Sequence, residues 1–177
     1  MSEPLPERID AERLAQEHTR VAGVIPLHKM PRLTQSLMAS AGEAAVEAEF
    51  ALGSDGRSVV RGHATATVQL TCQRCLDNMD WPLEAQFALA LVRDEDDAAS
   101  LPGEYEPLLW PDGTGSLPAL VEEELLLALP VAARHPDPAE CGPVTEMMRQ
   151  ESEHESQERE DNPFTVLNQL KSGRREQ

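Results

Sequence analysis

Alternating apolar and polar residues dominate the middle of the chain and predict β-strands. In SVVRGHATATVQLT, residues 58–71, small or apolar residues occupy every second position, as on a half-buried strand. The run WPLEAQFALALVRD, which begins at Trp81, alternates in the same way, and Pro82 suits an edge or the entry of a strand. Residues 43–52, EAAVEAEFAL, fit a strand or a helix, and the turn signal GSDGR after them favours a hairpin with residues 58–71. We therefore expect three consecutive antiparallel strands.

Helical signals flank these strands. Asp10 can cap a short helix that runs through Glu17. Ser116 can cap a longer helix, LPALVEEELLLALP, which has Pro118 in its first turn and ends at Pro130. For residues 21–33, VAGVIPLHKMPRL, the two prolines favour extended structure over a helix.

The longer helix carries a carboxylate on its apolar side. At 100° per residue, Glu124 falls inside the stripe of leucines and valines, whereas Glu122 and Glu123 fall outside it. An unpaired buried charge is very costly, so we expect Glu124 either to be buried against a basic residue such as Arg74 or to reach water at the rim of the stripe.

These elements predict an α+β fold: an antiparallel sheet or partial β-barrel with a packed helix, a mobile acidic segment and a short C-terminal helix. The expected organisation is an N-terminal helical segment (1–20), a single α+β core domain (21–143), an acidic disordered linker (144–161), and a C-terminal docking helix with a basic tail (162–177).

The C-terminal apolar segment is a candidate for docking. Asn162 and Pro163 can open a short amphipathic helix in NPFTVLNQLK. The partner could be the chain's own domain or another protein. The candidate docking residues are Phe164, Val166, Leu167 and Leu170.

Charged residues are distributed unevenly along the chain. The net charge is -17, and residues 76–161 alone contain 22 acidic against 4 basic residues. Such a stretch repels phosphates and either docks a basic protein or only keeps the chain soluble. Nucleic-acid contact would therefore fall to the first half of the chain or the tail, and the candidate residues are Lys29, Arg32, Arg57, Arg61 and Arg74.

The expected cellular compartment rests on the lack of a signal-peptide pattern and of a membrane-spanning apolar run in the sequence. The polar start MSEPLPERIDAERLAQEHTR predicts no signal peptide, and no apolar run approaches the roughly 20 residues needed to cross a bilayer. We therefore expect a cytoplasmic protein without membrane contact. In that reducing compartment, three cysteines argue for metal binding, redox chemistry or inert thiols rather than for structural disulfides.

The motif Cys72-Gln73-Arg74-Cys75 lies between two predicted strands and can supply two thiolates to one Zn²⁺. His135 and Cys141 would complete a Cys3His set. Two alternatives remain: unmetallated thiols that simply pack, and a redox pair, although a redox pair normally opens a helix. Phosphate-binding loops and hydrolase motifs are absent from the sequence.

An ordered set of motifs resembles one known family. The segments CQRCLDNMDWPL, YEPL, LVEEELLLALP and NPFTVLNQLK, with a His and a Cys before the last, follow one another across residues 43–171. This set resembles the YceD family, also called large ribosomal RNA subunit accumulation proteins.

The resemblance implies a bacterial, non-catalytic ribosome-biogenesis factor that supports synthesis or accumulation of 23S ribosomal RNA of the large subunit. Partners would be 23S rRNA, large-subunit ribosomal proteins or assembly factors. The alternatives are an acidic module that holds a basic ribosomal protein such as L32 and, less favoured, a thiol redox protein.

Overall fold

The computed structural model describes residues 5–142. The chain divides into a larger unit, Met1–Thr71 with Asn78–Ala133, and a smaller unit, Cys72–Asp77 with Arg134–Gln177. Within residues 5–142, no helix combines the length and the apolar character that crossing a lipid bilayer requires.

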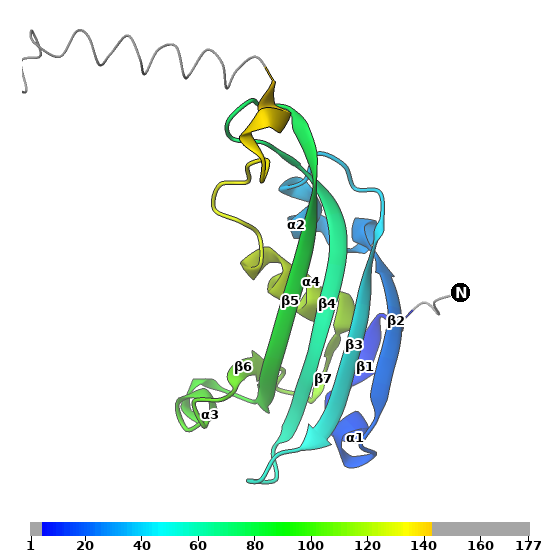
Figure 1. Ribbon diagram of the computed structural model, residues 1–177. Helices are drawn as coiled ribbons and strands as arrows, with labels where there is room; N and C mark the ends of the chain where they lie inside the picture. The colour runs from blue at the N-terminus through cyan, green and yellow to red at the C-terminus, as the bar shows by residue number, and fades with distance from the viewer. Residues whose placement is uncertain (1–4, 143–177) are drawn as a thin grey trace, which may run out of the picture. The chain divides into compact units, whose positions relative to one another are not determined.

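An open five-stranded sheet forms the centre of the larger unit (Figure 1). Its strands follow the order β2-β3-β4-β5-β6, and neighbours pair antiparallel except for β5 and β6. The strands are β2 (Arg20–Pro26), β3 (Glu43–Leu52), β4 (Ser58–Thr71), β5 (Asn78–Val92) and β6 (Glu106–Leu109).

The predicted hairpin of residues 43–52 and 58–71 is confirmed with the same boundaries, as β3 and β4. The third predicted strand is confirmed as β5, which starts earlier, at Asn78, because Asn78 still pairs with Thr71. Since β6 pairs only with Leu89–Val92, β5 has no second strand neighbour at Pro82 among the described residues. The edge position that Pro82 predicts is therefore confirmed.

The parallel pairing of β6 departs from the purely antiparallel expectation. Residues 93–105, which include the short helix α3 (Glu95–Ala99), carry the chain back beside β5 in the same direction. A parallel pair requires a crossover of about a dozen residues, and this connection has that length. The fold is therefore α+β with a mixed, open sheet.

Helices cover one face of the sheet. On β4, Ala64, Val68 and Leu70 face the core, whereas His63 and Gln69 lie exposed on the other face. The helices α1 (Ala11–Gln16), α2 (Pro31–Gln35) and α4 (Leu117–Leu127) lie on the core side (Figure 1). The core consists mainly of valine, leucine and alanine, as expected for a chain with 3% aromatic residues.

The predicted helix caps are confirmed. The Asp10 carboxylate accepts a hydrogen bond from the Arg13 backbone N–H at 2.9 Å, and the Ser116 hydroxyl accepts one from Ala119 at 3.2 Å. Asp10 is also the last residue of β1 (Arg8–Asp10), and Ser116 is the last residue of β7 (Thr114–Ser116). These two strands pair antiparallel as a two-stranded sheet. Both helices therefore start directly from paired strands.

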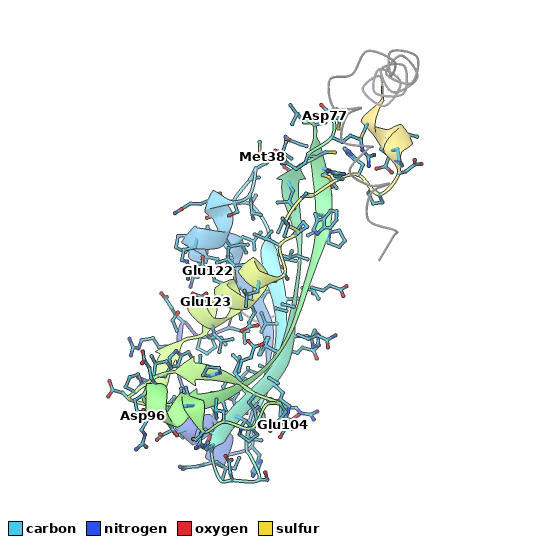
Figure 2. The ribbon with its side chains drawn as sticks, turned by 90° about the vertical axis from the view of Figure 1, so that its left-hand side faces the viewer. Met38, Asp77, Asp96, Glu104, Glu122 and Glu123 are labelled. Carbon is cyan, nitrogen blue, oxygen red and sulfur yellow. The ribbon has the colours of Figure 1, made fainter. Side chains whose placement is uncertain are left out.

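Glu122, rather than Glu124, is the buried carboxylate of α4, which corrects the expectation from helical periodicity. Glu122 is 5% exposed and accepts backbone hydrogen bonds from Arg32 at 2.6 Å and from Leu33 at 3.0 Å. Figure 2 shows it where α4 meets α2. Glu124 is partly exposed.

The expectation of extended structure for residues 21–33 was also wrong for the last three of these residues, which are helical. The helix α2 begins at Pro31, because proline suits the first position of a helix, where no internal acceptor exists for an N–H. The neighbouring N–H groups of Arg32 and Leu33 also lack intrahelical acceptors, and Glu122 satisfies them.

Candidate metal centre

The loop Cys72–Asp77 between β4 and β5 forms the first half of the site. The Cys72 N–H donates to the Asp77 carbonyl, and the Leu76 N–H donates to the Cys72 carbonyl, both at 2.9 Å. Leu76 adopts a φ of 65°, in the left-handed region that bulky residues rarely occupy. The chain thereby turns back within six residues and places the Cys72 and Cys75 thiols in one cluster.

Residues 134–142 form the second half. The Asp137 carboxylate accepts a hydrogen bond from the Ala139 N–H at 2.8 Å and caps the short 3-10 helix η2 (Pro138–Cys141). The helix ends at Gly142, which has a φ of 53°. This bend sets Cys141 Sγ at 3.5 Å from His135 Nδ1.

Three of the separations among the four ligand atoms match the edges of a tetrahedral zinc site. They all lie within 4.8 Å of one another, with Cys72 Sγ at 3.8 Å from Cys141 Sγ and Cys75 Sγ at 3.5 Å from His135 Nδ1. A tetrahedron with bonds of about 2.3 Å to sulfur and about 2.0 Å to nitrogen has sulfur–sulfur edges of about 3.8 Å and sulfur–nitrogen edges of about 3.5 Å. The predicted residues therefore come together, and they could hold a metal ion.

Electrostatics within the cluster favour one thiolate and oppose a second. Burial disfavours ionisation of Cys72, but the backbone N–H groups of Cys75, His135 and Arg74 outweigh it and lower the pKa of the Cys72 thiol from 9.0 to about 5. The Asp77 backbone N–H favours the Cys75 thiolate, but burial and the neighbouring sulfurs raise its pKa from 9.0 to about 11. A bound cation would offset this repulsion.

Arg74 supports the cluster from its outer side. Its backbone N–H lies 3.4 Å from Cys72 Sγ, and its guanidinium Nη1 lies 3.7 Å from Cys141 Sγ. Three thiolates and a neutral histidine around a Zn²⁺ ion would carry a net charge of -1, which a guanidinium would neutralise. Arg74, predicted as a candidate for nucleic-acid contact, therefore lies against the cysteine sulfur atoms.

The other nucleic-acid candidates are engaged in contacts of their own. Lys29 lies 3.7 Å from Glu7, Arg32 pairs with Glu123, and Arg57 pairs with both Asp55 and Asp97 at 3.2 Å. Arg61 donates to the Tyr105 hydroxyl and lies over its ring, 4.8 Å from the centroid. The structure therefore spreads these cations over several partners and does not gather them into one basic patch.

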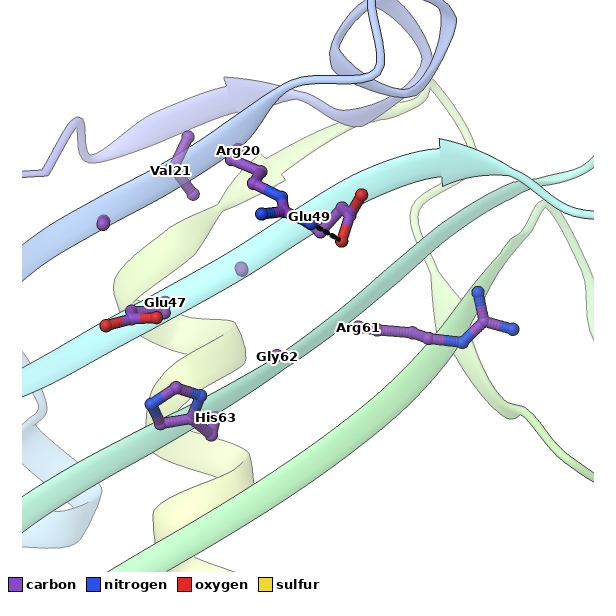
Figure 3. Close-up of a pocket in the computed structure, with 9 residues that line it drawn as sticks. Arg20, Val21, Glu47, Glu49, Arg61, Gly62 and His63 are labelled. Atoms are coloured by element: carbon purple, nitrogen blue, oxygen red, sulfur yellow. Dashed lines mark hydrogen bonds and ion pairs between the residues drawn. The ribbon is translucent and has the colours of Figure 1, made fainter.

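A shallow polar cavity of about 310 Å³ lies on the open face of the sheet (Figure 3). Figure 3 shows Arg20, Glu47, Glu49, Arg61 and His63 around it. Arg20 and Glu49 form an ion pair of 3.0 Å, and the lining contains two arginines and two glutamates in all. The lining is balanced in charge and is therefore not an anion site.

Two residues with defined contacts were not predicted as site residues. Glu122 bonds to a segment about ninety residues earlier, and no local pattern marks such a partner. Tyr105 holds Arg61, and its presence in the YEPL motif was the available signal. The docking candidates Phe164, Val166, Leu167 and Leu170 lie outside the described residues.

A family model and a curated protein are similar to this chain, and both carry the same description. A family model described as "Large ribosomal RNA subunit accumulation protein YceD" matches residues 60–171. A curated protein of that name from Haemophilus influenzae is 31% identical over 172 residues, which cover 94% of this chain and 96% of that protein. No solved structure matches the chain.

Proposed function

This chain belongs to the YceD family, and from that premise we propose that it supports accumulation of the large ribosomal RNA subunit, specifically its 23S RNA, as a cytoplasmic ribosome-assembly factor. The observation that carries the proposal is the match to a protein of that name along 94% of the chain. The coverage of both chains is nearly complete, so the comparison concerns the whole protein rather than one shared module.

The test of this function is genetic. Deletion of the gene in the source organism should lower the ratio of 23S to 16S ribosomal RNA and of large to small subunits, measured by RNA quantification and sucrose gradients. A plasmid copy of the intact gene should restore both ratios. Unchanged ratios in the deletion strain would refute the proposal.

We propose further that Cys72, Cys75, His135 and Cys141 bind one zinc ion in a structural role. The agreement of three ligand separations, 3.8 Å, 3.5 Å and 3.5 Å, with tetrahedral edges supports zinc. Four protein ligands close the coordination sphere and leave no position for a substrate. This donor set therefore favours a binding role over catalysis.

One observation favours the thiol redox alternative. A pKa of about 5 gives Cys72 the thiolate character that a redox cysteine needs. The same thiolate is a better zinc ligand, and the loop lies between two strands rather than at the start of a helix. Stoichiometric zinc together with protection of Cys72 from alkylation would support the metal role, whereas metal-free protein with a readily reduced disulfide would support the redox role.

The acidic charge favours action through a protein partner over direct RNA contact. Residues 76–161 repel phosphates, and the candidate cations of the first half already have partners. We therefore propose that a basic large-subunit protein, of which L32 is one candidate, is held by this chain. Crosslinking in cells, followed by identification of bound proteins and sequencing of bound RNA, distinguishes the two modes.

A further inference from the structure

The C-terminal end of α4 presents apolar side chains to solvent. Leu127 is 74% exposed, and Val131, just beyond the helix, is fully exposed. Between them, Ala128, Leu129 and Pro130 are only partly buried. A contiguous exposed apolar segment of this kind commonly marks an interaction surface.

Unpaired carboxylates lie beside this apolar segment. Glu124 lies one helical turn before Leu127. Burial raises the pKa of Glu124, and the nearby negative charges of Glu106 on β6 and of Glu123 raise it further. Glu123 pairs with Arg32, whereas Glu106 and Glu124 form no ion pair within the described part of the chain. Both carboxylates therefore lack a cation.

The C-terminal end of α4 lies beside strand β5 of the sheet. Figure 1 shows α4 crossing behind β4 and β5, so that its C-terminal end emerges beside β5. At that level β5 has no second strand neighbour within residues 5–142, because β6 pairs only with Leu89–Val92. A strand edge without a partner strand among the described residues, exposed apolar side chains and carboxylates thus occur together.

We propose that Glu106, Glu124, Leu127 and Val131, here called the α4 face, dock a segment of a partner protein that is rich in lysine and arginine and also carries apolar residues. The inference rests on the proposed function and names the surface through which a basic partner is held. Cations of the partner would pair with the two carboxylates, while its apolar side chains would cover Leu127 and Val131.

Charge selects this occupant over the others. A second copy would bring another chain of net charge -17 against the same carboxylates. RNA phosphates would meet the same repulsion. The chain's own residues 162–177 carry a net charge of +2, which matches the two carboxylates but leaves the whole chain at -17. A highly basic external protein supplies the missing charge.

The direct test places a photo-crosslinking amino acid, benzoylphenylalanine, at Leu127 of the full-length, metal-loaded protein. The probes are the extracted proteins of the organism's large ribosomal subunits and, separately, protein-free 23S rRNA. We expect Leu127 to crosslink to a lysine- and arginine-rich ribosomal protein. A second variant with the crosslinker at Leu52, another exposed leucine of the larger unit, should not crosslink to that protein.

Matched variants then test the chemistry. Glu106→Gln with Glu124→Gln, and separately Leu127→Ser, should each weaken binding of the crosslinked protein about tenfold. The control is Glu47→Gln with Glu84→Gln, which removes equal charge from exposed positions on the other face of the sheet. That control should leave the affinity within about twofold, and circular dichroism should show all variants folded.

Several results would overturn the inference. These are crosslinks from Leu127 only to residues 162–177, to a second copy or to rRNA, and equal binding by the α4-face variants and the control. Complementation separates this failure from failure of the proposed function. If the deletion lowers 23S rRNA but the α4-face variants restore it fully, the inference fails and the proposed function stands.

Discussion

The larger and the smaller unit of this protein differ in how much apolar surface each buries. The larger unit buries a continuous apolar core between its sheet and its helices. The described part of the smaller unit consists of two short segments, residues 72–77 and 134–142. These segments bury little besides Cys72 and Cys141 and form few backbone hydrogen bonds. A segment this small rarely folds by hydrophobic burial alone, so metal binding or disulfides usually supplement it.

This difference in burial, taken with the proposed zinc site, predicts that the two units respond to different perturbations. In the larger unit, removal of one apolar side chain should cost stability while the thiol cluster keeps its ligands. In the smaller unit, removal of the cation should release the local structure while the sheet persists. Four experiments test this distinction, in decreasing order of expected effect.

Removal of the metal should have the largest effect, confined to the smaller unit. Protein purified without chelator should contain about one zinc per chain, because structural zinc binds with roughly 10–16 kcal/mol at neutral pH. Chelation should raise amide hydrogen exchange in residues 72–77 and 134–142 while the β-sheet circular dichroism remains. Cys141→Ser should reproduce this result without chelator, and Ser100→Ala is the control. Absence of stoichiometric zinc would contradict the prediction.

Leu125→Ala should destabilise the larger unit. Leu125 is fully buried in the core, and such truncations cost about 2–5 kcal/mol through lost burial and the cavity left behind. Leu127→Ala, two residues later but 74% exposed, is the matched control and should change the free energy of unfolding by less than about 0.5 kcal/mol. Urea denaturation measures both, and equal effects would contradict the assigned burial.

Glu122→Ala should cost about 1–3 kcal/mol, because it leaves the N–H groups of Arg32 and Leu33 without an acceptor. Glu123→Ala removes only an exposed ion pair and should cost about 1 kcal/mol or less. Increased hydrogen exchange at Arg32 and Leu33 in the first variant alone would locate the effect. Equal losses in both variants would contradict the capping role.

Glu124→Gln should give the smallest effect, and it should depend on pH. Burial and the charges of Glu106 and Glu123 raise the pKa of Glu124 above 4.5 in the folded state. A raised folded pKa stabilises the protein below the unfolded pKa, and this contribution is lost as pH rises through the folded value. Glu124→Gln should therefore raise the melting temperature at pH 7 relative to the parent chain, and the gain should disappear below about pH 4. A gain independent of pH would contradict this assignment.

Periodicity in the sequence by itself determined most of the larger unit. The alternation in residues 58–71 and the turn signal GSDGR after residues 43–52 together led to β3 and β4 with their observed boundaries. The caps at Asp10 and Ser116 were equally local, since a capping side chain reaches only two or three residues along the chain. The residue types of the Cys3His set were also readable, because thiolates and imidazole are the ligands that zinc prefers.

Only the tertiary structure decided which distant groups meet. It brought Cys72 and Cys141 to 3.8 Å across 69 residues, and it placed Glu122 rather than Glu124 under the N–H groups of α2. Helical periodicity assigns a face to each side chain, but it cannot say what lies opposite that face. Hydrogen bonds, ion pairs and metal bonds are short-ranged and directional, so the partner's backbone position decides them.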